Sequence, residues 1–449
     1  MSHEISQFLN DNPDIEALDA FVIDLCGNAV GKRLPRSHMA SFVTAGAPLC
    51  AAMQLLDVLG ETSDPMGYGF SNGDPDAVGR MIPGTLSRIP WSSKPRAQCL
   101  MVMHDDATDA PLDYEPRQIL KNVLSHFEAR ELTPVCAVEM EFYLVEQDRG
   151  PQGELVRARS LQTGREATGG RVLSMDVLDE YSAFLDAIVA AAAEQNIPVT
   201  SMINEYGAGQ FEVNLHHQSD ALRAADDAAL LRRLIVGVAK SFGKNATFMS
   251  KPFHEDSGSG MHVHLSLVDK AGNNVFAPDY PDADARLAHA IGGMQAGLGE
   301  SMAIFAPNIN AWRRFGPDLF VPVTRDWGLN NRSVAFRIPP GEASARRIEH
   351  RASGAEANPY LVLAAILASV DYGLTHQLDP GAAAEGNACS EQDPELPSTL
   401  WGALAQLKAG SLLPAYLGVD YPALYAAVKE AEFERFMSIP TEREYEWYL

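Results

Sequence analysis

The chain has 449 residues, of which 46% are hydrophobic and 21% are charged. These values are typical of a globular protein, and they exclude a disordered chain, a collagen-like repeat and a coiled-coil rod. The 59 acidic residues outnumber the 35 basic residues, so the formal net charge is −24. Such an acidic surface repels phosphate backbones, and we therefore expect no nucleic-acid partner.

Cysteine usage and the N-terminal segment predict the cellular compartment. The five cysteines are scattered along the chain without a CxxC pair, which is typical of free thiols in a reducing cytosol. The N-terminal segment is polar and lacks the apolar core of a signal peptide. The longest apolar run, residues 360–370, is too short to span a bilayer. We therefore expect a cytoplasmic protein with no membrane association.

The first hundred residues are typical of a small strand-rich domain. Apolar stretches at residues 21–25 and 99–103 are separated by several turn-forming clusters. Charged residues and prolines gather at residues 105–115. We place the domain boundary in this segment, with residues 1–108 as the first domain and 109–449 as a larger second domain.

The second domain alternates predicted helices with predicted strands. Apolar periodicity predicts four helices, over residues 117–130, 177–195, 221–241 and 359–372. A segment rich in Gly, Pro, Ala and acidic residues, 379–397, predicts a surface loop.

The informative feature is a set of predicted strands with polar side chains on one face and apolar side chains on the other. In the strand at residues 135–145, Glu139 and Glu141 share a face, which puts them about 7 Å apart. Glu212 lies on the polar face of a second strand, and Glu205 precedes that strand in a Gly-rich loop. Each of these faces, taken alone, could also be a solvated strand surface.

Two later segments add histidines and arginines to this pattern. One face of the strand at 261–267 carries His262, His264 and Ser266. A charged segment further on alternates Arg347, Glu349 and Arg351 onto one face, and the segment before it contributes Arg332 and Arg337.

If these strands adjoin, their glutamates would face one another at low dielectric, and divalent cations would relieve the repulsion. Carboxylate ligands with an imidazole suit Mg²⁺ or Mn²⁺ rather than a thiolate zinc site. Arginines opposite them indicate an anionic substrate, phosphate foremost. The residues alone favour metal-dependent phosphoryl transfer, with carboxylate-bridged metal hydrolysis as the rival. The segment at 27–33 is not a P-loop, because it is one residue short and lacks Ser or Thr after Lys32.

Five segments, in chain order, resemble motifs of the glutamine synthetase family: VEMEFYL, NEYGAGQFEVN, KPFHEDSGSGMHVHLS, NNRSVAFRIP and SARRIEHR. The resemblance implies an α+β fold, in which a small N-terminal β-grasp-like domain precedes a large catalytic domain with a curved antiparallel sheet flanked by helices. It implies a homo-oligomer, a dodecamer of two hexameric rings with active sites between subunits. It also implies an ATP-dependent reaction that joins the γ-carboxylate of L-glutamate to an amine.

The resemblance assigns a role to each candidate residue. The resemblance implies two or three metal ions per active site. A first metal would be held by Glu141, Glu205 and Glu212, and a second by Glu139, His262 and Glu349. Nucleotide contacts fall on His264, Ser266, Arg332, Arg337 and Arg347, and the glutamate site on Gly258, His262, Arg314 and Arg351. Asp24 matches the aspartate that binds the amine, and we expect it to act in catalysis with Arg332 and Arg337.

One departure from the family pattern bears on the amine. Ammonia-using members carry a loop glutamate where this chain has Phe320. An aromatic ring removes the charge that ammonium needs, and it could pack on an alkyl chain or face a cation. The segments GNAVGK, EYGAGQFE and EYEWYL resemble the γ-glutamylpolyamine synthetase branch, which includes relatives acting on monoamines.

We therefore expect a ligase that joins glutamate to a polyamine or monoamine through a γ-glutamyl phosphate intermediate, with Phe320 in the substrate site. An ammonia-dependent glutamine synthetase and a non-catalytic family scaffold are the alternatives.

Overall fold

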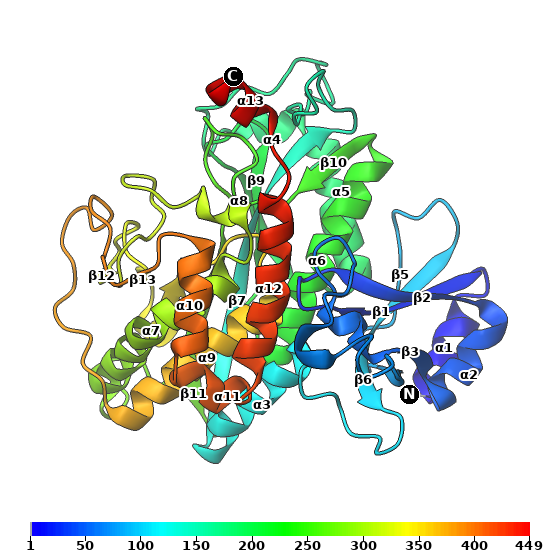
Figure 1. Ribbon diagram of the computed structural model, residues 1–449, viewed down its shortest axis with the longest axis horizontal. Helices are drawn as coiled ribbons and strands as arrows, with labels where there is room; N and C mark the ends of the chain where they lie inside the picture. Colours follow the sequence, from blue (N-terminus) through cyan, green and yellow to red (C-terminus); the bar gives the residue numbers. More distant parts are fainter. Residues whose placement is uncertain (1) are drawn as a thin grey trace.

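The computed structural model describes residues 2–449, and its first sheet is formed by residues 17–105, at the right of Figure 1. The strand order is β2-β1-β6-β4-β3, with β5 paired to β6, and only β1 and β6 run parallel. The strands are β1 (Ala17–Ile23), β2 (Ala29–Pro35), β3 (Ala47–Cys50), β4 (Asp76–Met81), β5 (Ser87–Arg88) and β6 (Arg96–Asp105).

Strand β1 contributes to two hydrophobic cores because both of its faces are apolar. Leu18, Ala20 and Val22 pack into a core made only of residues from the first 103 positions. Phe21 and Ile23, on the opposite face, join the large core of the rest of the chain. Because successive side chains of β1 point to opposite faces, this strand also packs the first sheet against the second part of the molecule.

The second sheet is curved and nearly closed, and it runs in the order β12-β13-β14-β11-β7-β9-β8, with β10 paired to β7. Its pairs are antiparallel except for β12 with β13. The strands are β7 (Leu132–Glu146), β8 (Val199–Asn204), β9 (Gln210–Leu215), β10 (Lys244–Thr247), β11 (Met261–Asp269), β12 (Trp327–Leu329), β13 (Phe336–Ile338) and β14 (Ile348–His350). The predicted domain boundary falls between Asp105 and Leu132, in the segment that connects the two sheets.

Helices surround this sheet and complete the large core (Figure 1). They are α1 (Ser2–Asp11), α2 (Arg36–Ala45), α3 (Pro116–Ala129), α4 (Met175–Glu180), α5 (Ser182–Glu194), α6 (Ala221–Ser241), α7 (Ala283–Phe305), α8 (Ile309–Trp312), α9 (Pro359–His376), α10 (Leu400–Ala409), α11 (Leu412–Leu417), α12 (Tyr421–Met437) and α13 (Glu442–Tyr448). Short 3₁₀ helices are η1 (Ala51–Leu55), η2 (Pro65–Gly67) and η3 (Ala343–Ala345). No helix or strand occurs within the predicted loop at 379–397.

The predicted single helix at 177–195 is wrong, because the chain forms two helices that meet at Tyr181. Tyr181 has φ −113° and ψ 11°, which is outside the helical range. Its ring is buried, and its hydroxyl donates to the carbonyl oxygen of Ala158 at 3.2 Å. A tertiary contact therefore overrides the apolar periodicity at this residue.

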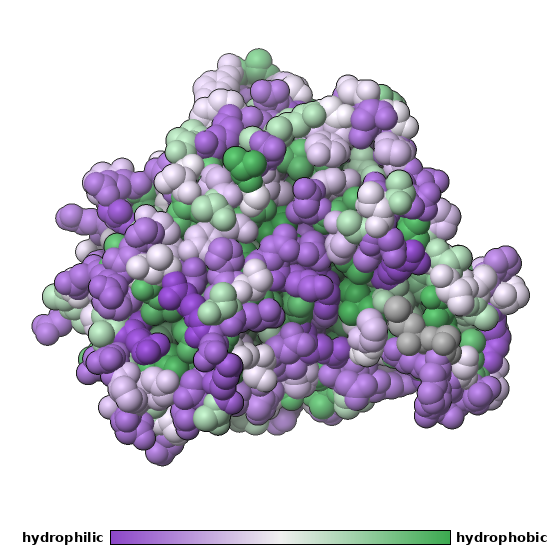
Figure 2. Space-filling view, turned by 90° about the horizontal axis from the view of Figure 1, so that it is seen from below, coloured by the Kyte–Doolittle hydropathy of each residue, from purple (hydrophilic) through white to green (hydrophobic). Residues whose placement is uncertain are grey.

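One face of the molecule is largely hydrophilic. On the face shown in Figure 2, hydrophilic residues predominate and hydrophobic residues form smaller groups between them. Among the described residues, no helix combines the length and apolar character needed to span a bilayer.

Candidate active site

A cavity of about 2090 Å³ opens on the polar face of the second sheet. Every candidate site residue named from the sequence lines it except Asp24: Glu139, Glu141, Glu205, Glu212, Gly258, His262, His264, Ser266, Arg314, Phe320, Arg332, Arg337, Arg347, Glu349 and Arg351. The sequence segments that carry these residues lie far apart in the chain, and the sheet brings them to one place.

Strand register explains this convergence. Glu139 on β7 lies opposite His262 on β11, and Glu141 on β7 lies opposite Glu212 on β9. Glu349 on β14 is paired with His264 on one side and with Arg337 on the other. Because side chains alternate between faces, these residues all project from the same face of the sheet. Their apolar neighbours, such as Val138 and Val213, fill the core beneath.

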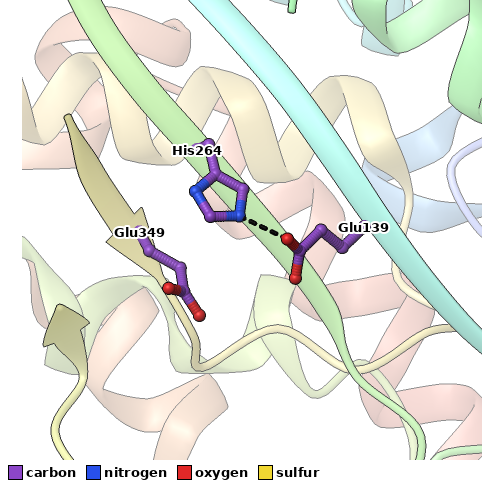
Figure 3. Close-up of side chains that lie close together, drawn as sticks. All are labelled: Glu139, His264 and Glu349. Carbon is purple, nitrogen blue, oxygen red and sulfur yellow. Dashed lines mark hydrogen bonds and ion pairs between the residues drawn. The ribbon is translucent and has the colours of Figure 1, made fainter. Parts of the chain in front are cut away.

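Glu139 is the centre of two groups of possible metal ligands. Its Oε1 lies 2.6 Å from His264 Nε2, and its Oε2 lies 3.5 Å from His262 Nδ1. One group combines Glu139 with His264 and Glu349, whose side chains point toward one another from three strands (Figure 3). The other combines Glu139 with Glu212 and His262, and in each group the ligand atoms lie within 4.8 Å of one another.

These groups overlap with the two metal sets that the resemblance implies, and those sets stay predictions. His264, expected only at the nucleotide, joins Glu139 and Glu349, while His262 joins Glu212. Glu141 is absent from both groups, and its Oε2 accepts hydrogen bonds from the backbone N–H of Gly260 at 2.9 Å and from a side-chain amide. Glu205 lines the same cavity but also lies outside both groups.

Burial opposes the ionised form of each carboxylate in this arrangement. Burial, and then the nearby charges of Glu139 and Glu141, raise the pKa of Glu212 to about 9. Burial, and then Glu205, raise the pKa of Glu141 to about 7. Burial acts in the same direction on Glu139, but hydrogen bonds from the two histidines outweigh it and hold this pKa well below its usual range. A divalent cation would favour the ionised form of all these groups, so the donor set fits Mg²⁺ or Mn²⁺.

Arginines balance the negative charge on the other side of the cavity. Arg337 donates to Glu349 Oε2 at 2.6 Å, and Arg351 donates to Glu349 Oε1. Burial opposes the ionised form of Glu349, but Arg351 lowers the pKa of this carboxyl to about 2. Arg347 Nε donates to His264 Nδ1 at 3.2 Å. Their guanidinium groups provide bidentate donors for phosphate or carboxylate oxygens.

Arg314 and Gly258 form a close contact deep in the cavity. The Arg314 guanidinium is buried, and it donates to the carbonyl oxygens of Ala352 at 2.9 Å and Arg351 at 3.2 Å. A Cβ atom at Gly258 would lie 2.7 Å from Arg314 Cγ, so this position tolerates no side chain. Burial lowers the pKa of Arg314 to about 10, which leaves it a cation at neutral pH.

The predicted contact between Asp24 and an amine stays a prediction, because the resemblance places active sites between subunits and Asp24 lies away from the cavity of its own chain. Asp24 lies outside the cavity and is only 1% exposed. Its Oδ1 accepts from the backbone N–H of Asn28 at 2.8 Å, and its carbonyl oxygen accepts from the Asn358 side chain at 2.7 Å. Next to it, Lys429 Nζ on α12 donates to Cys26 Sγ at 3.2 Å. Asp24 therefore stabilises the turn between β1 and β2, which α12 covers.

Several residues lining the cavity received no role from the sequence. Gln210 shares the polar face of β9 with Glu212, so strand alternation places it at the site without indicating its function. Asn214, two residues further, donates to Glu212 Oε1 at 2.8 Å. His216 and His217 stack with their ring centroids 4.2 Å apart just after β9, and no sequence pattern indicates this arrangement.

Comparison with known proteins gives consistent results. A family model described as "Glutamine synthetase, catalytic domain" matches residues 113–448. The gamma-glutamylputrescine synthetase PuuA of Escherichia coli (strain K12) is 36% identical over 450 residues, which cover 100% of this chain and 94% of that protein. A glutamate–isopropylamine ligase of a Pseudomonas species is 35% identical, over 75% of this chain and 72% of its own length.

A solved structure titled "GmaS/ADP complex-Conformation 1" has the same fold. It superposes with a TM-score of 0.83 at 27% sequence identity, over 99% of this chain and 98% of its own. The expected α+β architecture is thereby confirmed. The match to the family model, the full-length relative and the shared cavity motifs together show that the chain belongs to the glutamine synthetase family.

Proposed function

We propose that this protein is an ATP-dependent ligase that joins the γ-carboxylate of L-glutamate to an organic amine through γ-glutamyl phosphate. The observation that carries the proposal is a single cavity in which buried carboxylates on β7 and β9 face arginines from β13, β14 and their flanking loops. A carboxylate is a poor electrophile and must be activated before an amine can displace an oxygen from it. Such a cavity suits phosphoryl transfer, which depends on positioning and on neutralising charge.

The arginines account for the anionic substrates. Arg332, Arg337 and Arg347 line the cavity, and the resemblance implies that they would contact the nucleotide. Arg314 and Arg351 would hold the carboxylates of glutamate, and Gly258 gives the substrate close access to the backbone. Fixed guanidinium groups in a buried site need no reorganisation when charge develops on the transferred phosphoryl group.

Divalent metal ions fit the carboxylate end of the cavity. Glu139, Glu212, Glu349, His262 and His264 supply the ligand atoms that lie close enough together, with Glu141 and Glu205 beside them. When bound there, Mg²⁺ or Mn²⁺ would neutralise phosphate charge and keep the carboxylates ionised. The residues of the chain would meanwhile orient glutamate and exclude water, which protects an acyl phosphate from hydrolysis.

The mouth of the cavity favours an organic amine over ammonium. Phe320 is 60% exposed at the cavity, at the position where ammonia-using members carry a glutamate. The names of two relatives, which specify putrescine and isopropylamine, support the same choice.

The test is phosphate release by the purified protein with ATP, Mg²⁺ and glutamate, comparing ammonium with a panel of organic amines. We expect an organic amine to give the larger kcat/KM. Equal or faster turnover with ammonium would make the protein an ammonia-dependent glutamine synthetase. Sedimentation of the same preparation would test the expected dodecamer, whose mass is twelve times the 48.7 kDa of one chain.

Glu212→Ala tests whether the cavity carboxylates are needed for catalysis. Removing this carboxylate from β9 should lower amine-dependent phosphate release at least about 100-fold, since the metal group around Glu139 loses a ligand. Glu128→Ala, at an exposed position on α3, is the control and should match the wild type. Unchanged activity in Glu212→Ala would favour the non-catalytic scaffold.

A further inference from the structure

Glu356 is an acidic residue of the segment between β14 and α9, and it does not line the cavity. Its side chain is half-buried, and both of its carboxylate oxygens accept hydrogen bonds. Oε2 accepts from the hydroxyl of Ser250 at 2.5 Å, and Oε1 accepts from the side-chain amide of Asn308 at 3.3 Å. One carboxylate therefore joins two segments that lie far apart in the sequence.

Each of these two partners stands at the start of a segment that carries part of the proposed glutamate site. Ser250 begins a loop that closes where the N–H of Ser259 donates to the Ser250 carbonyl oxygen at 2.8 Å, and Gly258 lies at the end of this loop. Asn308 is the N-cap of α8, and Arg314 follows shortly after the end of this helix. The carboxylate therefore holds the starting points of both parts of the site.

The backbone around Glu356 is fixed to the same two parts of the fold. The N–H of Gly354 donates to the carbonyl oxygen of Phe305 at 2.9 Å, and the N–H of Ala355 donates to that of Ser259 at 3.1 Å. From the other side, Arg232 on α6 donates to three carbonyl oxygens of this segment, the closest at 2.7 Å. Since the backbone is held on both sides, a shorter side chain at position 356 would not reach both partners.

Glu356 also supplies negative charge near the buried guanidinium of Arg314. Burial lowers the pKa of Arg314 to about 10, and the charges of Glu141 and then Glu356 act in the opposite direction. Glu141 lines the cavity, whereas Glu356 acts from outside it. The Glu356 carboxylate can therefore favour the cationic form of Arg314 without occupying the space that a substrate carboxylate needs.

We infer that Glu356 is a positioning residue for glutamate, because it fixes the Gly258 loop and Arg314 relative to each other through Ser250 and Asn308. This inference rests on the proposed function. Glu356 itself would not touch the substrate. A loop and a helix that shift by a fraction of an ångström would no longer present backbone and guanidinium groups to the same glutamate molecule.

The test is steady-state phosphate release by variants at position 356, with the amine that the wild type uses best. Glu356→Ala should raise KM for glutamate at least about tenfold, since two hydrogen bonds to a charged group are lost. Glu356→Gln keeps the length and one oxygen acceptor, so it should raise this KM by about threefold or less. In both variants KM for ATP should stay close to the wild-type value.

Glu300→Ala is the matched control. Glu300 is also half-buried, it accepts hydrogen bonds from backbone N–H groups at the start of α11, and it does not line the cavity. Its replacement removes structural hydrogen bonds, but KM for glutamate should remain unchanged. A rise of the same size in Glu300→Ala would show that loss of stability explains the effect, and would overturn the inference.

Ser250→Ala tests the same contact from its other side, and it keeps the inference falsifiable if Glu356→Ala does not fold. It should raise KM for glutamate about threefold or more, and it should add nothing further in a Glu356→Ala background. An unchanged KM for glutamate in Ser250→Ala and Glu356→Asp, or an equal rise in KM for ATP, would overturn the inference and leave the proposed ligase intact. If the wild type releases no phosphate with organic amines or ammonium, the proposed function fails and the inference fails with it.

Discussion

Gln210 connects three parts of the active site through one side-chain amide. Its Oε1 accepts from the backbone N–H of Gly207 at 3.0 Å. Its Nε2 donates to the carbonyl oxygen of Gly258 at 2.9 Å and contacts Glu141 Oε2 at 3.3 Å. Gln210 is buried, so its side chain alone fixes the positions of three groups: the loop after Glu205, the Glu141 carboxylate and the glycine beside Arg314.

Replacing Gln210 should therefore impair substrate binding more than folding. Gln210→Ala leaves a buried carbonyl and a buried N–H without partners, at a cost of about 1–3 kcal/mol. We expect KM for glutamate to rise about tenfold or more, measured by steady-state kinetics beside the thermal unfolding midpoint. Gln406→Ala, where the amide lies on the surface and donates to the carbonyl oxygen of Glu395, is the control. An unaltered KM would show that Gln210 does not position the site.

Strand alternation made the shared face of most site residues predictable, but it did not indicate the surroundings of Asp24. Glu139, Glu141 and Glu212 could be placed on one face because β7 and β9 follow the two-residue period. Asp24 also matched a family pattern, but its surroundings come from Asn358, which is 334 residues away. Long-range contacts of this kind leave no periodic signal in the sequence.

At the scale of elements, helices α7 and α9 pack closely against each other. A Cβ atom on Gly293 would lie 2.7 Å from Gly373 Cα, so the two backbones touch without room for a side chain. Small residues at both positions let these helices pack together behind the sheet.

Gly293→Ala should destabilise the protein even though alanine favours helices. The new methyl group would force α7 away from α9, at a cost of about 2–3 kcal/mol after its gain in helix propensity. Gly299→Ala in the same helix is the control, since its Cβ would meet only the flexible end of Gln406. Chemical denaturation of both variants measures the difference. Equal midpoints would contradict the close contact.

Helix prediction succeeded where apolar periodicity is uninterrupted. The predicted helix at 221–241 coincides with α6, whereas α7 was not predicted. Helix α7 contains four glycines, which lower helix propensity and dilute the apolar pattern, and packing against α9 restores its stability. The charged segments around β13 and β14 were expected as longer strands, but only three residues of each form regular ladders.

At the scale of the whole molecule, Glu115 lies at the joint between the two sheets. It precedes α3, and its Oε2 accepts from the backbone N–H of Met103 on β6 at 2.9 Å. Burial raises the pKa of Glu115 to about 8, although the Met103 N–H and Arg117 act in the opposite direction and Asp226 adds to the increase. The folded protein therefore keeps this carboxyl protonated at pH values where the unfolded chain ionises it.

This shift makes the joint sensitive to alkaline pH. A raised carboxyl pKa stabilises the fold at low pH, and the contribution is lost as pH rises from about 4.5 through 8. Glu115→Gln keeps the oxygen that accepts from Met103 and cannot ionise. The free energy of unfolding of this variant, relative to that of wild type, should therefore increase as pH rises over this range, by a few kcal/mol at most. Unfolding midpoints at pH 5 and 8.5 test this, with Glu128→Gln on the exposed face of α3 as control. A constant difference between variant and wild type would show that Glu115 does not titrate with folding.

The contact between Cys26 and Lys429 also implies an order in which parts of the chain fold during synthesis. The two residues are 403 positions apart. A ribosome adds about 5–20 residues per second, so roughly 20–80 s separate the synthesis of these partners. During that interval the turn that holds Asp24 has no cover from α12, and the first sheet must rely on its own core of Leu18, Ala20 and Val22. The earliest part of the chain can thus fold first, but its docking is completed only when the last long helix has been made.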